Sequence, residues 1–310
     1  MNFPRSISAV VVALLLHSAL MHAKTKQKAS CDFTTFSAPS GYTLNLVNGV
    51  SDDGTVVGQL VDNQTSEPVA FAYSASGVFT EYAAPKSSTT WLYGANASSM
   101  NAGSYQDSGY PGHIHGFTWQ GKNMTVVNYP GAPNTWLFDI NQGGTLVGSF
   151  SAGDSITKGF MMVNNKFTII AYPDAQVTFA DAISDNGVVA GTYASSLISY
   201  GFLWQNGTFT SINYPKAQWG TALVGVNNSG VVAGNYFAGV ATNGFIYESG
   251  EFKDIVYSGA KYTAAGGINN NGLVSGQIVP EARFENPTLR LTLRAVIPNH
   301  YSAHAATTSN

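Results

Sequence analysis

A short motif recurs six times along this chain, and its spacing constrains the fold more than any other feature. The motif combines a tight turn with a β-like stretch, as in VNNSGVVAGNY (Val226–Tyr236). Its second glycine falls at Gly58, Gly103, Gly148, Gly191, Gly234 and Gly276. Successive glycines lie 42 to 45 residues apart. A regular period of this length is typical of proteins built from one supersecondary unit per repeat.

Each repeat predicts four short strands rich in Val, Ile, Phe, Tyr and Trp, which suit a pleated, buried surface. Examples are Thr135–Asn141, Gly230–Tyr236, Gly201–Gln205 and Thr208–Pro215 for the first to fourth strand. The turn between the first two strands ends on Gly in five of the six copies, which indicates a residue with positive φ. The Asn, Asp and Ser residues of the motif are interpreted as turn residues.

The ends of the repeated region complement each other. Phe33–Pro39 matches a lone fourth strand, and Leu289–Val296 matches a lone third strand. Pairing them would remove open sheet edges. We therefore predict an all-β fold, a six-bladed β-propeller of four-stranded blades over residues 33–297, in which the N-terminal strand completes the last blade. The alternatives are a seven-bladed propeller and a β-solenoid.

The repeat resembles the secreted bacterial HAF repeat family, whose signature is His-Ala-Phe at the start of the third strand. The equivalent positions here read VAF (Val69–Phe71), HGF (His115–Phe117), KGF, YGF and NGF, and the "IN…G…VVG" part of the pattern matches better. The resemblance covers about residues 33–296. It implies export and a propeller fold, and it supplies no catalytic residues to carry over.

The first 23 residues are typical of a secretory signal peptide. Arg5 provides the positive charge, Ile7–Leu20 the apolar region and Met21–Ala23 a small-residue cleavage site. We expect a protein that is secreted, or periplasmic, after cleavage near Ala23. Residues 24–32 form an N-terminal segment, and residues 298–310 a polar tail. The single cysteine, Cys31, excludes an internal disulfide; its role is open, and a lipid anchor there is a rival interpretation.

Charge and hydropathy argue against two partner classes. The chain holds 14 Lys and Arg against 17 Asp and Glu, and loss of Arg5 with the leader leaves a net charge of −4. Nucleic acid requires clustered basic residues, which are lacking, so we expect no nucleic-acid partner. After the leader, no segment is apolar enough to span a membrane. We expect a monomer without a cofactor.

Loops of variable length are where function usually lies on a repetitive scaffold. The loop of the second repeat, Gln106–His115, carries Asp107, Tyr110, His113 and His115. The two histidines could share one side of a strand, but a zinc site normally has three or four protein ligands. Surface or structural roles are therefore favoured, no metal is assigned, and metal binding by His113 and His115 is left open.

Trp91, Trp136 and Phe179 occupy one repeat position and form a candidate stacking platform for a sugar. They share strand parity with Ile140 and Ile183, so packing between blades is the competing and favoured interpretation. The acids Asp139, Asp154, Asp174 and Asp181 are placed near the loop-rich face of neighbouring blades. A carboxylate pair for glycoside chemistry needs a fixed separation, which the sequence alone does not establish.

These features favour a secreted binding or interaction module for carbohydrate or a cell-surface partner. The alternative is a propeller-type hydrolase or lyase with its site at the mouth of the central channel. An enzyme predicts converging carboxyl or imidazole groups there with perturbed ionisation. A binding module predicts accessible aromatic rings flanked by Asn, Ser and Thr. Catalysis is the less favoured of the two readings, because no catalytic residues could be named.

Overall fold

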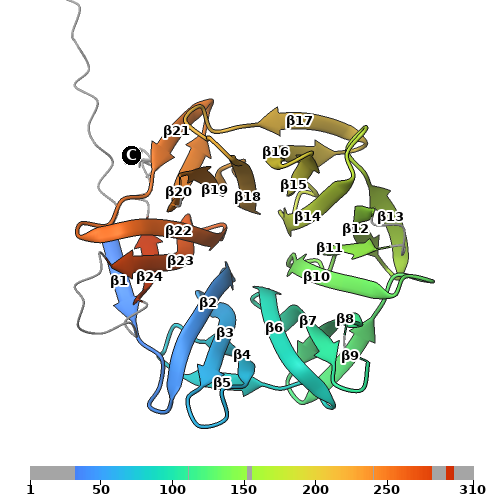
Figure 1. Cartoon of the computed structure of the whole chain (residues 1–310), viewed down its shortest axis with the longest axis vertical. Coiled ribbons are helices and arrows are strands. Elements are labelled where there is room, and N and C mark those ends of the chain that lie inside the picture. The colour runs from blue at the N-terminus through green and yellow to red at the C-terminus, as the bar shows by residue number, and fades with distance from the viewer. Residues whose placement is uncertain (1–31, 111, 152–155, 240, 281–290, 297–310) are drawn as a thin grey trace, which may run out of the picture.

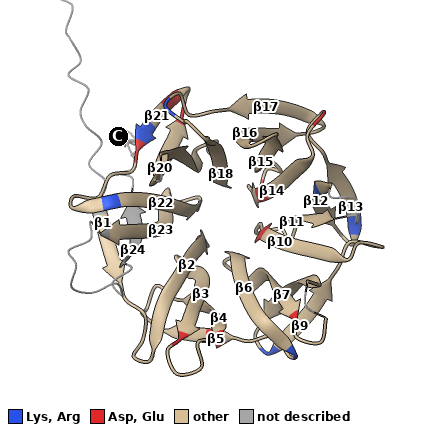
Figure 2. Ribbon diagram, viewed as in Figure 1, with Lys and Arg blue, Asp and Glu red and all other residues tan. Residues whose placement is uncertain are grey.

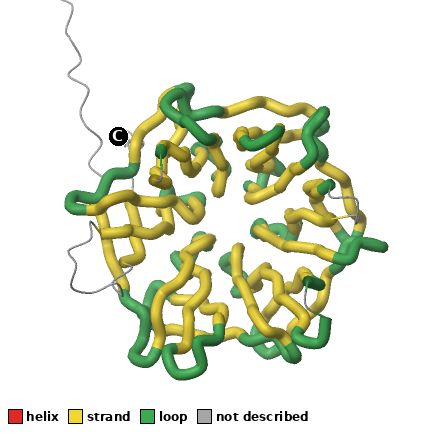
Figure 3. Tube along the Cα trace, viewed as in Figure 1, coloured by secondary structure: helices red, strands yellow, loops and turns green. Residues whose placement is uncertain are grey.

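The strands form a ring of four-stranded units around a central axis (Figure 1). The computed structural model describes residues 32–110, 112–151, 156–239, 241–280 and 291–296, and these contain strands and loops but no helix (Figure 3). The predicted signal peptide, Cys31 and the predicted C-terminal tail lie outside the described residues. Within each unit the strands pair antiparallel from the axis outward, and in all units but the last they do so in chain order.

The units are numbered 1 to 6 along the chain. Units 1 and 2 comprise β2 (Tyr42–Val50), β3 (Val56–Asp62), β4 (Pro68–Tyr73), β5 (Phe79–Tyr82), β6 (Ser87–Ala95), β7 (Met100–Asp107), β8 (Ile114–Gln120) and β9 (Asn123–Val127). Units 3 and 4 comprise β10 (Asn134–Ile140), β11 (Leu146–Ser151), β12 (Thr157–Val163), β13 (Lys166–Ile170), β14 (Val177–Ile183), β15 (Val189–Ser195), β16 (Ile198–Gln205) and β17 (Thr208–Ile212). Units 5 and 6 comprise β18 (Gly220–Val226), β19 (Val232–Ala238), β20 (Ala241–Glu248), β21 (Glu251–Asp254), β22 (Ala260–Ile268), β23 (Leu273–Pro280), β24 (Leu291–Val296) and β1 (Asp32–Phe36).

The pairing predicted between the two ends of the repeated region is present. β1 runs antiparallel to β24, with Asp32 opposite Val296 and Phe36 opposite Thr292. Strand order in unit 6 is therefore β22, β23, β24, β1. The earliest described strand thus supplies the outer edge of the unit that holds the latest ones.

The core lies between neighbouring units and is built on one repeated phenylalanine. The Phe of each third-strand motif is completely buried, at 0% exposure; these residues are Phe71, Phe117, Phe160, Phe202 and Phe245. A second repeated contact comes from the Tyr-Pro pairs. Tyr129 stacks on Phe150 of the next unit with ring centroids 3.6 Å apart. Tyr172 on Tyr193 and Tyr214 on Tyr236 repeat this at 3.5 and 3.9 Å. Each stack buries large apolar surface across a unit boundary.

The turn glycines have the predicted conformation. Gly144, for example, has φ 78°, in the left-handed region that only Gly adopts without steric cost. Unit 2 places Ser99 at this position with φ 58°, so the backbone shape is kept without the glycine.

The second glycine of the motif is required for a different reason. A Cβ at Gly148 would collide with the carbonyl oxygen of Trp136 in the neighbouring inner strand. The equivalent clashes at Gly103 and Gly191 are with Trp91 and Phe179. A strand glycine commonly marks close backbone approach or a β-bulge, and here both are present.

The motif's polar residues do more than shape turns. The Oδ1 of Asn141 accepts a hydrogen bond from the backbone N–H of Thr145, while its Nδ2 donates to the carbonyl of Ser184 in the next unit. Asn269 similarly donates to Ser51, which joins unit 6 to unit 1. The motif therefore links neighbouring units by hydrogen bonds, in addition to forming a hairpin.

Candidate functional site

Every inner strand carries a β-bulge at the level of the motif's second glycine. In β10 the register shifts between Leu137 and Asp139, which leaves Phe138 as the extra residue. A bulge re-aims side chains out of the regular alternation. The extra residues of the six inner strands all line one central pocket: Asn48 and Gly49, Tyr93, Phe138, Asp181, Val224, and Gly266.

The pocket has a volume of about 390 Å³ and lies along the ring axis. Its wall is largely aromatic. Phe138 is placed edge-on to both Tyr93 and Phe179, with ring centroids 5.3 and 6.0 Å apart. Phe237 and Ser199 also line it. Each lies near the end of its strand that is farther from the tight turn. A mainly apolar cavity with a few convergent polar groups is the usual form of a small-molecule site.

Two carboxyl groups face this pocket, on β10 and β14, where Figure 2 shows acidic residues near the central opening. Burial raises the pKa of the Asp139 carboxyl to about 7, and the charge of Asp185 adds to this. The backbone N–H groups of Ile183 and Ile140 oppose the rise, donating to Asp139 at 3.0 and 2.8 Å. Asp139 is therefore bound to its own unit and the next, which gives it a structural task.

Asp181 has fewer hydrogen-bond donors around its carboxyl group than Asp139, among the described residues. Burial raises its pKa to about 7 as well, and the neighbouring hydroxyl of Thr192 lowers it only in part. Protein surrounds the group, yet it keeps some solvent-accessible surface, as expected on a pocket wall.

Thr192 has a hydroxyl without a hydrogen-bond partner of normal geometry within the described residues, although it lies near Asp181. Its side chain is 8% exposed and lines the pocket. An unpaired buried hydroxyl costs on the order of 1–3 kcal/mol. The wall beside Asp181 is thus polar and incompletely satisfied.

The tight-turn end of the channel is narrowed by a second set of side chains, which we call the turn belt: Asp52, Gln142, Asp185, Asn228 and Asn270. At five of the six unit boundaries a backbone N–H of the turn donates to the belt side chain of the next unit, for example at 2.8 Å from Gln142 to Asp185 and from Asn270 to Asp52. The exception is the boundary between units 1 and 2, because unit 2 has Ala97 at the belt position. Asn270 also donates across to Asp185 at 3.0 Å. The cavity between them holds only about 40 Å³. Because their hydrogen bonds are made to one another, the belt residues close this end rather than offer a site.

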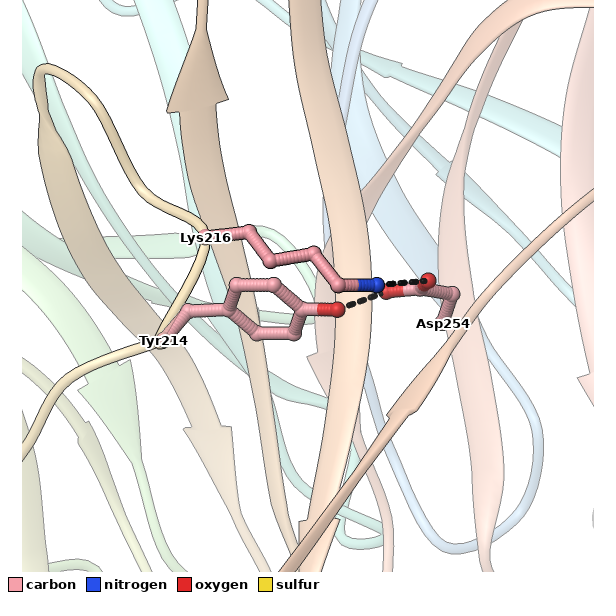
Figure 4. Close-up of polar contacts among 3 residues, drawn as sticks. All are labelled: Tyr214, Lys216 and Asp254. Carbon is pink, nitrogen blue, oxygen red and sulfur yellow. Dashed lines mark hydrogen bonds and ion pairs between the residues drawn. The ribbon is translucent and has the colours of Figure 1, made fainter.

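A polar cluster at the rim has a similar structural task (Figure 4). Tyr214 donates to Asp254 of the neighbouring unit at 2.5 Å, and Lys216 lies 4.0 Å from the same carboxylate. Burial, followed by the hydrogen bond to Asp254, raises the pKa of Tyr214. The Lys216 side chain is 74% exposed, so its ion pair contributes little. The cluster fixes a unit boundary.

The residues expected from the sequence are dispersed. Phe179 lines the central pocket, whereas Trp91 and Trp136 are half-buried in their strands and do not line it. No ring contact among the described residues joins the two tryptophans, and their role as a sugar platform stays a prediction. The parity argument for them was wrong. The buried positions of β10 are Thr135, Leu137 and Ile140, because the bulge at Phe138 inserts a step of three.

The unit 2 loop lies apart from this pocket. His113 is exposed and stacks on Tyr110, with ring centroids 5.7 Å apart, while His115 packs against Tyr105 and bonds Asn128. Asp107 accepts from the backbone of Gly109 within the loop. The two histidines therefore have different partners. No group of three His, Cys, Asp or Glu side chains in the described ranges is arranged to hold a metal ion.

The four acids singled out by sequence also separate. Asp139 lies next to the last residue of β10, near the tight turns, so its expected place by the loop-rich face is wrong. Asp181 is on the pocket wall, Asp174 is exposed in a loop, and Asp154 lies outside the described residues. Sequence reasoning missed Tyr93 and Thr192. The sequence feature that could have identified these two residues is their position relative to the motif glycines.

Comparison with known proteins identifies the fold. No family model and no curated protein matches the chain. Several solved structures match it in fold. A mutant of AofleA from Arthrobotrys oligospora is 10% identical, with a TM-score of 0.53 over 87% of this chain and 91% of that one. A mutant of Aleuria aurantia lectin, in complex with Fucalpha1-6GlcNAc, is 10% identical, with a TM-score of 0.51 over 86% and 100%.

A candidate gluconolactonase is 11% identical, with a TM-score of 0.50 over 86% of this chain and 93% of that one. At these identities the likeness shows the β-propeller fold and no activity. Across the residues the structure describes, no helix has the length and apolar character needed to cross a membrane.

Proposed function

We propose that the chain is an exported, monomeric six-bladed β-propeller of the HAF type that binds a carbohydrate ligand, free or on a cell surface, in its central pocket. The six units are its blades, and β1 completes the last one. The pairing of β1 with β24 supports this closure, as do the bonds from Asn269 to Ser51 and from Asn270 to Asp52. The Aleuria aurantia lectin, a protein of similar fold, is consistent with a binding role.

The observation that carries the proposal is the composition of the pocket wall. Phe138, Phe179 and Phe237 present aromatic surface, and Asp181 and Asn48 add hydrogen-bonding groups. A sugar has one apolar ring face and a rim of hydroxyl groups, so it requires both kinds of contact. The pocket volume of about 390 Å³ falls in the range of small-molecule sites.

The alternative is a hydrolase or lyase that uses the same pocket. The raised pKa of Asp181, to about 7, favours it, because a carboxyl with such a pKa can act as a general acid or base near neutral pH. Asp139 does not supply the second group, since its carboxylate is bonded to two backbone N–H groups. Binding is therefore ranked first.

A glycan-array screen with the purified mature chain tests the proposal, followed by titration of the strongest ligand. Phe179→Ala should weaken binding at least tenfold by removing aromatic wall. Leu197→Ala, at a residue 93% exposed in a loop, should leave the affinity unchanged. Circular dichroism and thermal melts establish that each variant is folded. Absence of binding, together with turnover of a lactone or glycoside that Asp181→Asn abolishes, would reverse the ranking.

A further inference from the structure

The central pocket has acidic groups and no basic ones. Asp139 and Asp181 line it, and no Lys, Arg or His is among its described lining residues. The side chain of Asp139 is bonded to backbone N–H groups of two units. Within the described part of the chain, the Thr192 hydroxyl is the only group placed to stabilise the charge of Asp181. A carboxylate in such surroundings favours a cationic ligand and disfavours an anionic one.

Thr192 departs from its five counterparts in the repeat. The residue after the motif's second glycine bonds the next unit's inner strand in every other unit; these residues are Gln59, Ser104, Ser149, Asn235 and Gln277. Among the described residues Thr192 makes no such bond, and its hydroxyl, which lies beside the Asp181 carboxyl, has no partner of normal hydrogen-bond geometry. Unit 4 is thus the one unit that lacks this bond to the next unit among the described residues, and it is also the unit that carries Asp181 on the pocket wall.

We propose that the central pocket binds an amino sugar with a free amine, whose ammonium group lies against Asp181 while its ring packs on Phe138 and Phe179. This inference rests on the proposed function and names the ligand class within it. An ammonium group has three N–H donors and no acceptor, which suits a carboxylate flanked by a hydroxyl oxygen. Aromatic faces also attract a cation held over them.

Acetylation of the amine should abolish this recognition. An N-acetyl group carries no charge, so it leaves the Asp181 carboxylate buried against a neutral amide. A plain hydroxyl at the same carbon keeps the sugar ring but supplies no cation. Glucosamine, N-acetylglucosamine and glucose differ at that one carbon and therefore separate charge recognition from sugar recognition.

Proton linkage gives a second signature. The pKa of Asp181, raised to about 7, means that the ionised form is depleted as the pH falls below 7. The titratable groups that share its pocket are Asp139, on β10, and Tyr93. Of the other strands packed against β14, β15 contributes Tyr193 and β12 contributes Lys158, neither of which lines the pocket, and β11 and β18 contribute none. A sugar amine with a pKa of roughly 8, like an α-amino group, loses its charge above that pH. Affinity should peak near pH 7.5 and fall roughly 20-fold at pH 5.5, because only the ionised carboxyl binds.

Isothermal titration calorimetry with the three sugars at pH 7.5 tests the inference. Glucosamine should bind at least tenfold more tightly than glucose and N-acetylglucosamine. In Asp181→Asn that preference should vanish and the pH profile should flatten. Asp174→Asn is the matched control, since it removes one carboxylate at an exposed loop position and should retain the preference.

Equal affinity for all three sugars would overturn the inference and leave the proposed function standing. Glucosamine that fails to bind at ~10 mM would also overturn it, and the array screen then decides the fate of the proposed function separately. Retention of the preference in Asp181→Asn would refute the assignment of the ammonium to this carboxyl. Thr192→Val, which removes the hydroxyl with little change of shape, should weaken glucosamine more than glucose.

Discussion

Replacing Gly148 by alanine should destabilise the protein strongly, although alanine is the smallest possible change. The new Cβ would collide with the backbone carbonyl oxygen of Trp136, which no side-chain rotation can relieve. β10 and β11 would have to separate, which weakens their ladder hydrogen bonds at about 1 kcal/mol each. Together with an overpacking cost of about 1–3 kcal/mol, the free energy of unfolding should fall by roughly 3–5 kcal/mol.

Gly143→Ala is the matched control in the same repeat. Its Cβ would lie 3.4 Å from the Asn141 Oδ1, an ordinary contact, and its φ is not positive. Urea unfolding should place this variant within about 0.5 kcal/mol of the wild type. For Gly148→Ala the melting temperature should fall by roughly 10 °C, at about 2–4 °C per kcal/mol for a chain of this size. Equal stability of the two variants would refute the clash argument.

The remaining predictions concern the turn residue Asn141, the rim, the buried carboxyl of Asp181 and the closing strand. Asn141→Ala removes a bond within its turn and one to the next unit, and urea unfolding should show a loss of about 1–3 kcal/mol. Asn141→Ser keeps an uncharged acceptor for the turn, as Ser184 does in unit 4, and should lose less; equal losses would contradict the assignment of two bonds to Asn141. Tyr214→Phe keeps the inter-unit stack, so its free energy of unfolding should fall by only about 1 kcal/mol, whereas Tyr214→Ala should lose about 3–5 kcal/mol. A similar loss in both variants would contradict a stabilising role of the stack. A folded pKa of about 7 for Asp181, above the usual 3.9, means that its contribution is fully present below pH 4 and lost as the pH rises through 7. Asp181→Asn should therefore gain about 1–3 kcal/mol over the wild type at pH 8 and nothing at pH 4, and a pH-independent difference would contradict this. Deletion of residues 1–36 exposes the edge of β24 and should cause self-association in sedimentation experiments; a stable monomer would contradict the role assigned to β1.

The sequence predicted the strands and their turns because these depend on local rules. It predicted the pairing of the chain ends because each end carries the part of a repeat that the other end lacks. The glycine of the turn between the first two strands, such as Gly144, indicates positive φ in each repeat that has it. The alternation of apolar residues gives the strand length, and the period gives the number of copies.

The pocket was not predictable in the same way. Its wall consists of bulge residues that differ from repeat to repeat, such as Tyr93, Asp181 and Gly266. A bulge resets the parity of a strand, so alternation places Trp136 and Ile140 on one face where the structure does not. The turn asparagines were interpreted correctly as local turn formers. Their bonds to the next unit could not be seen, because they depend on the curvature of the ring.

The most direct test of the account is a crystal structure of the protein with glucosamine, or with the strongest ligand from the array screen. The account predicts electron density for the sugar on the ring axis, with its amine within hydrogen-bond distance of Asp181 and its ring against Phe179. Density at the Tyr110–His113 loop or on the outer surface, with the central pocket unchanged, would contradict it.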